Sequence, residues 1–134
     1  MSIETVRISK QGRDHLSRLK RRTGIGQWNI LCRWALCASL AEPGGPRPVQ
    51  GGERPIEMTW KTFGGDHADV YLALLKERCN QDGLDTDESN LSEQLHAHIH
   101  RGIGYLSGEK SIANIEGLIR QGIGQNPDEQ STCQ

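Results

Sequence analysis

The chain has 134 residues, of which 34% are hydrophobic and only one is Phe, so we expect a single small domain with little core material. No apolar run approaches the ~18 residues that a membrane span needs, and no charged-then-apolar leader is visible. We therefore expect a cytoplasmic protein without membrane contact.

Charge is divided unevenly along the chain, although the formal net charge is only −1. Residues 1–34 hold eight basic and two acidic side chains (+6), whereas residues 35–134 hold eight basic and fifteen acidic ones (−7). A separation of this kind indicates one face for an anionic partner and another face that repels it.

A short strand is predicted over residues 3–9, IETVRIS, because β-branched side chains dominate there. Alternation along this strand places Val6 and Ile8 on one face, and Thr5 and Arg7 on the other.

A basic helix is predicted over residues 10–23, with Ser9 as its N-cap and Gly24 as its C-terminal stop. Leu16 and Leu19 form its narrow apolar stripe. Positive charge near a helix C-terminus suits the helix dipole, and such a run is most often a solvated face. Here nearly all the excess positive charge lies in one segment, which favours phosphate binding. The candidate DNA-binding residues are Lys10, Arg13, Arg18, Lys20, Arg21 and Arg22.

A second helix, predicted over residues 27–41, is apolar on nearly all of its sides. Only Asn29, Arg33 and Ser39 interrupt this pattern. One small subunit is not expected to cover every face of such a helix, so we expect a homo-oligomer.

The remainder of the chain is predicted to be mostly helical. Residues 42–55 are rich in Pro and Gly and predict a loop, and residues 58–65 could pair as a short strand. Apolar spacing predicts three further helices, over residues 66–83, 91–106 and 111–122.

Three histidines in the stretch HAHIH are the strongest candidate for metal binding. His96 and His100 have the i, i+4 spacing with which two imidazoles can share one metal ion on a helix. No pattern supplies a third ligand, so we favour His98 facing the core between two surface histidines. A metal-dependent enzyme remains an alternative.

No other stretch of the sequence resembles an active site. The four cysteines lack paired CxxC spacing, and neither a GxSxG motif nor a phosphate-binding loop is present. We therefore expect no enzyme activity, no metal and no cofactor. The cysteines are Cys32, Cys37, Cys79 and Cys133.

The predicted fold is mainly α: a short N-terminal strand followed by helices, ribbon-helix-helix-like and oligomeric. In a ribbon-helix-helix protein, strands of two subunits pair and their outward side chains enter the major groove. Thr5 and Arg7 would then read bases, and the alternative function is a sequence-specific transcriptional repressor.

Three stretches taken together resemble the DndE family, the small subunits of bacterial DNA phosphorothioation (Dnd) systems. They are residues 4–43 (ETVRISK to LAEP), 58–71 (MTWKTFGGDHADVY) and 95–106 (LHAHIHRGIGYL). The resemblance covers roughly residues 3–122, which predicts one DndE-like domain over residues 1–122 with parts 1–41, 42–65 and 66–122. Residues 123–134 are expected to be a disordered tail.

The resemblance implies a function in the replacement of a non-bridging phosphate oxygen of DNA by sulfur. It implies a non-catalytic, mostly helical tetramer that binds DNA with a preference for nicked duplex, while other Dnd proteins supply the sulfur and iron–sulfur chemistry. If the strand and second helix serve assembly, Thr5 and Arg7 are not free to read bases. We therefore expect phosphate contacts from the helix over residues 10–23.

Overall fold

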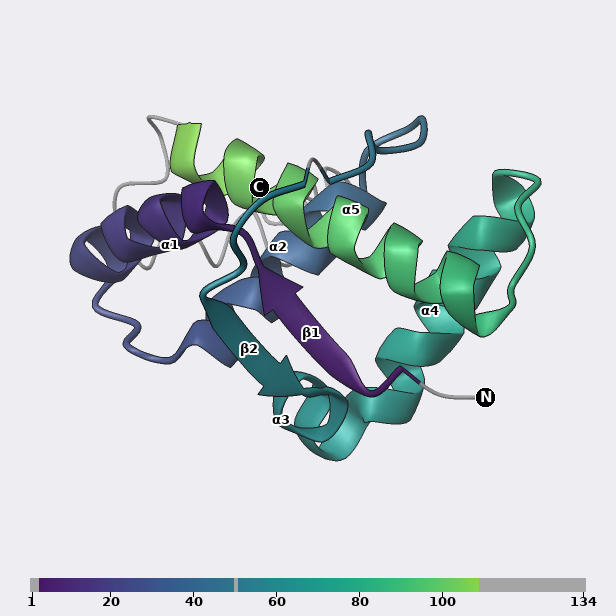
Figure 1. Ribbon diagram of the computed structural model, residues 1–134, viewed down its shortest axis with the longest axis horizontal. Helices are drawn as coiled ribbons and strands as arrows, with labels where there is room; N and C mark the ends of the chain where they lie inside the picture. The colour runs from purple at the N-terminus through teal and green to yellow at the C-terminus, as the bar shows by residue number, and fades with distance from the viewer. Residues whose placement is uncertain (1–2, 50, 109–134) are drawn as a thin grey trace, which may run out of the picture.

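A two-stranded antiparallel sheet and five α-helices make up the part of the chain described by the computed structural model, residues 3–49 and 51–108 (Figure 1). The elements in chain order are β1 (Thr5–Ile8), α1 (Lys10–Thr23), α2 (Trp28–Leu40), β2 (Ile56–Thr59), α3 (Trp60–Gly64), the 3-10 turn η1 (Gly65–His67), α4 (Ala68–Gln81) and α5 (Glu88–Gly108). The mainly helical prediction is confirmed. The predicted helix over residues 111–122 and the tail lie outside the described residues.

Helix α2 lies at the centre of the molecule. Every residue from Trp28 to Leu40 is buried or half-buried. Its neighbours are α1, α3 and α5 of the same chain. Three helices of the same chain therefore cover much of α2, while Trp28, Ile30 and Trp34 stay half-buried, and the homo-oligomer stays a prediction.

The contact between α2 and α5 is close enough to require a glycine. A Cβ at Gly102 would overlap the backbone carbonyl of Ala35. Gly102 and Ala35 are both buried, so the two helix backbones meet directly at this crossing. Small residues at such a point allow the large side chains on either side of it to interlock.

Two arginines from other helices satisfy the carbonyl end of α2, whose last turn contains no basic residue. Arg78 of α4 donates to the carbonyls of Leu40, Glu42 and Gly44. Arg101 of α5 donates to the hydroxyl and the carbonyl of Ser39, each at 2.8 Å. These guanidiniums therefore stabilise the fold and are not available as a free basic surface.

The sheet forms within one chain. Strands β1 and β2 pair in antiparallel register, from Thr5 opposite Thr59 to Ile8 opposite Ile56. The predicted strand over residues 58–65 is wrong in its bounds, because the Thr59 hydroxyl accepts from the amide of Thr62 and begins α3. The intermolecular ribbon of the ribbon-helix-helix prediction is not confirmed, since β2 already occupies one edge of β1.

Among the described helices, none has both the length and the apolar character needed to cross a membrane.

The glycine at the crossing gives a direct stability prediction. Replacing Gly102 by Ala forces a methyl group against the α2 backbone and should lower the free energy of unfolding by about 3 kcal/mol, the upper end of overpacking costs. Urea denaturation followed by circular dichroism measures this change.

Gly104→Ala is the matched control on the same helix, because nothing lies within 4 Å of a Cβ built there. This substitution should raise stability by about 0.5–1 kcal/mol through helix propensity. Equal effects of the two substitutions would contradict the close crossing.

Candidate nucleic-acid interface

Local sequence determines how α1 is built and which face it buries. The Ser9 side chain accepts from the amide of Gly12 at 3.0 Å, and Gly24 ends the helix in the left-handed conformation with φ 78°. Both predicted caps are confirmed. The buried stripe repeats at helical spacing and consists of Gly12, Leu16, Leu19 and Thr23.

All six predicted DNA-binding residues lie outside that stripe. Arg13 and Lys20 are half-buried beside it, and the other four are exposed: Lys10, Arg18, Arg21 and Arg22.

Contacts within the chain hold three of these six side chains. The Lys20 ammonium lies 4.0 Å from the ring centre of Trp28, and Arg22 donates to the carbonyl of Ser107 at 3.1 Å. Arg13 lies 3.9 Å from the carboxylate of Asp14, and the two side chains are 41% and 61% exposed. A contact of this length and exposure contributes little stability.

The other three cations form one free face. Lys10, Arg18 and Arg21 make no side-chain hydrogen bond or ion pair with any described residue. At 100° per residue they fall within a sector of about 80° on the side of α1 opposite the buried stripe. At about 1.5 Å per residue they extend over roughly 16 Å, which is long enough to contact several phosphates of one strand. We call Lys10, Arg18 and Arg21 the free basic face.

Helix α5 holds α1 in place at its C-terminal end. The His15 ring lies 2.6 Å from the Ser107 hydroxyl, and the Ser107 carbonyl accepts from Arg22. The guanidinium of Arg22 thus lies at the carbonyl end of α5, where a positive charge is stabilised.

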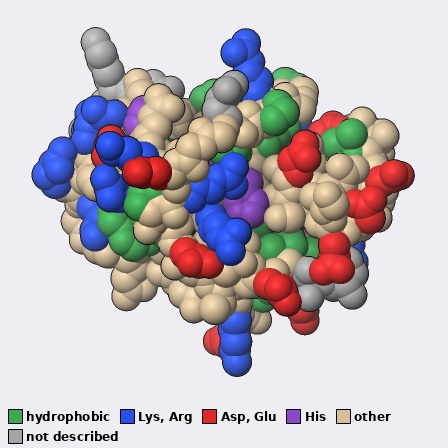
Figure 2. All heavy atoms as spheres, viewed as in Figure 1, with side chains coloured by type: hydrophobic (Ala, Val, Ile, Leu, Met, Phe, Trp, Pro, Cys, Tyr) green, Lys and Arg blue, Asp and Glu red, His purple; other side chains and the backbone are tan. Residues whose placement is uncertain are grey.

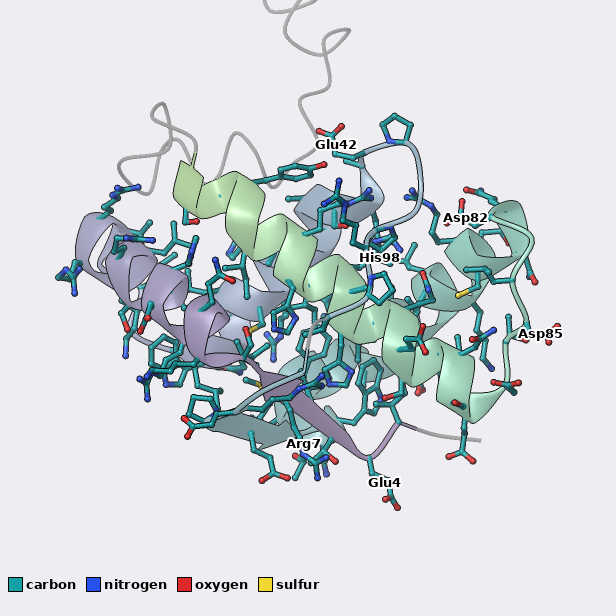
Figure 3. All side chains as sticks on the ribbon, turned by 45° about the horizontal axis from the view of Figure 1, so that its top comes forward. Glu4, Arg7, Glu42, Asp82, Asp85 and His98 are labelled. Carbon is teal, nitrogen blue, oxygen red and sulfur yellow. The ribbon has the colours of Figure 1, made fainter. Side chains whose placement is uncertain are left out.

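Basic side chains are densest over α1, and acidic ones are most frequent at the other end of the molecule. Figure 2 shows a cluster of Lys and Arg over α1, at the left of the view, further basic side chains at the centre, and more carboxylates towards the right than at the left. Asp82 and Asp85, at the connection between α4 and α5, lie far from α1 (Figure 3). The charge asymmetry of the sequence therefore corresponds to a partial separation in space.

Tertiary contacts also bring Arg54 near the start of α1, which the sequence did not indicate. The amide of Lys10 donates to the carbonyl of Glu53 at 3.2 Å, so the Pro- and Gly-rich segment returns to this helix. Arg54 then lines a cleft of about 640 Å³ together with Arg7 and His96. Arg33, by contrast, donates to the carbonyl of Phe63 and does not contribute to the basic surface.

The expected arrangement of the three histidines is only partly confirmed. His98 is fully buried as predicted, but His96 is also buried, with 8% exposure, and His100 is half-buried. The expectation of two surface histidines is wrong because β1 lies against this side of α5. His96 accepts from the amide of Arg7 and His100 from the amide of Ser9, each at 3.0 Å.

Both nitrogens of His96 and His100 are engaged by the protein. Their Nδ1 atoms lie 2.6 and 2.7 Å from the carbonyls of Ser92 and His96 respectively. A metal ion would have to break one of these hydrogen bonds. Within residues 3–49 and 51–108, no cluster of three or more metal-binding side chains is found.

His98 belongs to a buried network at the end of α2. Its Nδ1 lies 2.8 Å from the Ser39 hydroxyl, which itself accepts from Arg101. The Nε2 atom of His98 has no hydrogen-bond partner among the described residues. Burial, with the nearby Arg78 and Arg101, lowers the pKa of His98 to about 4.

The described cysteines are protonated thiols at neutral pH. Burial raises the pKa of Cys32 to about 12 and also raises the pKa of Cys37 and Cys79. Because the thiolate is the reactive form, these three side chains are poorly suited to nucleophilic sulfur transfer or metal ligation.

Comparisons with known proteins point to one family. The family of the DNA sulphur modification protein DndE matches residues 5–114. A crystal structure of DndE from Escherichia coli B7A, involved in DNA phosphorothioation modification, is 26% identical with a TM-score of 0.66, covering 79% of this chain and 98% of that chain. A crystal structure of a glycine-to-lysine mutant of DndE, involved in DNA phosphorothioation, is 22% identical with a TM-score of 0.63, covering 81% and 100%. No match was found among curated proteins.

The thiol environment predicts a low reactivity of Cys32. In the folded protein at pH 8, iodoacetamide should leave Cys32 unmodified, because the side chain is buried and protonated. Mass spectrometry of tryptic peptides, with a urea-unfolded sample as the control, measures the modification. Rapid alkylation of Cys32 in the folded protein would contradict this assignment.

Proposed function

Because the chain belongs to the DndE family of DNA sulphur modification proteins, we propose that it is a non-catalytic subunit that binds DNA for the phosphorothioation machinery. The free basic face of α1 carries the proposal. Lys10, Arg18 and Arg21 are three cations with no side-chain partner among residues 3–49 and 51–108, presented on one side of a rigid helix.

Contacts to the phosphate backbone suit this surface better than base recognition does. Arginine and lysine on a helix face neutralise phosphates and release counterions, which gives affinity without dependence on sequence. Arg7, the proposed base reader of the repressor alternative, is bonded to Glu57 at 3.3 Å on the neighbouring strand. The acidic end of the molecule repels DNA and so restricts binding to the α1 side.

The environments of the histidines and cysteines support a subunit without catalytic activity of its own. His96, His98 and His100 serve packing and hydrogen bonding, and the buried thiol of Cys32 is protonated. We assign the sulfur chemistry to other Dnd proteins, and we propose nicked duplex as the preferred DNA.

Loss of two free cations should weaken DNA binding. Replacing Arg18 and Arg21 by Ala should reduce affinity roughly tenfold and lower the salt slope of log K by about two units, one per phosphate contact. Fluorescence anisotropy with nicked, intact and single-stranded DNA over a salt series measures both quantities. Tighter binding to the nicked duplex is expected.

Lys61→Ala with Lys76→Ala is the matched control, since it removes the same net charge from α3 and α4. This variant should bind nearly as well as the unmodified protein. If both pairs weakened binding equally, the effect would be one of net charge, and the assignment to α1 would fail.

The proposal includes self-association, with a tetramer as the expected form. The large exposed apolar side chains among the described residues include Val70 and Leu74, one turn apart on α4, 53% and 45% exposed. This face is distant from α1 (Figure 1), so association there leaves the free basic face open to DNA.

Replacing Val70 and Leu74 by Glu should therefore convert the oligomer into monomers, because two charges would be buried at the interface. Light scattering on a sizing column measures the mass. Asn80→Glu with Gln81→Glu adds the same charge at exposed positions near the end of α4 and should leave the oligomer intact. A monomeric unmodified protein would contradict self-association.

A further inference from the structure

The spacing of two histidines on α5 matches the spacing of two amides on β1. His96 and His100 are separated by four helical residues, a rise of about 6 Å. Arg7 and Ser9 are separated by two extended residues, about 6.7 Å. Both amides point away from β2, and each donates to an imidazole Nε2 at 3.0 Å. The two rings thus take the place that a third strand would have on this edge.

The same contacts require neutral rings of one tautomer. Each Nδ1 lies within 2.7 Å of a carbonyl oxygen, which can only accept, so Nδ1 carries the proton. Each Nε2 faces a backbone amide, which can only donate, so Nε2 must be unprotonated. A second proton on either ring would place an Nε2–H group opposite the backbone N–H group of β1. Two donors cannot form a hydrogen bond, so the contact to β1 would break.

Some groups around the two rings lower the pKa of His96 and His100, and others raise it. Burial lowers the pKa of both histidines; the guanidinium of Arg54 lowers both further, and His100 and Arg7 add to the effect at His96. The hydrogen bonds to the carbonyls of Ser92 and His96 raise the pKa of the two rings.

Charged side chains also line the clefts beside the two rings. Carboxylates lining the cleft beside His96 are those of Glu4, Glu88 and Glu93. Charged side chains lining the cleft beside His100 are Lys10, Arg47, Glu53 and Arg101.

These contacts reach the beginning of α1. Ser9, whose amide His100 holds, is also the residue whose hydroxyl caps the helix. The His100 ring packs against the first turn, where a Cβ on Gly12 would lie 3.4 Å from its Cδ2 atom. Release of His100 therefore frees the cap and the first turn, which includes Lys10 of the free basic face.

We propose that His96 and His100 form a proton-sensitive clamp that positions β1 and the first turn of α1, so that the DNA-binding face is fully assembled only while both rings are neutral. The regulatory part of this inference rests on the proposed DNA binding. The clamp itself does not depend on it.

The direction of the pH effect follows from the preference of the folded state for neutral rings. Unfolded histidine titrates near 6.5, so the clamp contributes fully above this pH. Its contribution falls as the pH decreases below 6.5, and the loss is complete once the pH passes the lowered pKa of the folded protein.

NMR tests the clamp without DNA. At about pH 8, the imidazole ¹⁵N shifts of His96 and His100 should report a protonated Nδ1 and a bare Nε2, and the amides of Arg7 and Ser9 should exchange slowly. Lowering the pH to about 5.5 should speed exchange of these two amides relative to the β1–β2 amides. Unprotected amides at the higher pH, or Nε2–H tautomers, would overturn the clamp.

DNA binding tests the regulation, with a fluorescent nicked duplex as the probe. Affinity should fall once the pH is low enough to populate the protonated, open form, which lies below 6.5 because the pKa of both rings is lowered in the clamped form. From there the loss should be at most about tenfold per pH unit for each proton taken up. This decrease is opposite to simple electrostatics, because added positive charge on histidines strengthens phosphate binding. His96→Gln with His100→Gln supplies acceptors that cannot be protonated, so this variant should bind at pH 8 and lose the decrease. His67→Gln, at an exposed histidine on η1, should keep it.

The outcomes separate the two proposals. Identical pH profiles for the unmodified protein and the double glutamine variant would overturn regulation by the clamp while leaving DNA binding intact. Absence of binding to any DNA at pH 8 would overturn the proposed function and the regulation with it, and the NMR result would still decide whether the clamp exists.

Discussion

The direct contact between the backbones of α2 and α5 at Gly102 and Ala35 is the constraint on which the other contacts depend. It brings α5 close enough for Arg101 to reach the carbonyl end of α2. It also fixes how α5 presents its histidines to β1 and Ser107 to α1. Helix α5 thus contacts the core helix, the sheet and the basic helix at once.

The basic surface follows from the same arrangement. Helix α1 has only a narrow buried stripe, so most of its circumference faces solvent. Its ends are held by polar contacts to α5, from the Ser9 amide to His100 before the first turn and from Arg22 to the Ser107 carbonyl in the last turn. The cations between these ends are therefore presented on a rigid element, which reduces the entropy lost when phosphates bind. The acidic connection between α4 and α5 lies at the other end of the molecule.

Features set by neighbours in sequence could be predicted from the sequence. The bounds of α1, its Ser9 and Gly24 caps and its buried stripe follow from capping chemistry and helical spacing, and the structure confirms them. The strand predicted over residues 58–65 extends too far because Thr59 caps a helix, whereas Trp60 and Phe63 are residue types that favour strands. Local signals of this kind compete, and tertiary packing decides between them.

Features set by contacts between distant segments could not be predicted. The apolar sequence of α2 indicates that the helix is buried, but the same sequence suits burial by another subunit or by the same chain. The i, i+4 spacing of His96 and His100 suits a metal ion or a strand edge equally, and the approach of β1 decides between them. The proximity of Arg54 to α1 depends on a loop closing through the carbonyl of Glu53. The fold, the contacts of the histidines and the position of the basic helix thus all depend on how α1, α2 and β1 pack against α5.

Chemical-shift mapping of backbone amides on addition of a nicked duplex tests directly whether α1 is the DNA-binding element. Perturbations should concentrate on residues 10–22, with the largest around Lys10, Arg18 and Arg21, and residues 68–90 should change little. Perturbations concentrated on α4 and the acidic connection, with α1 unaffected, would contradict that expectation.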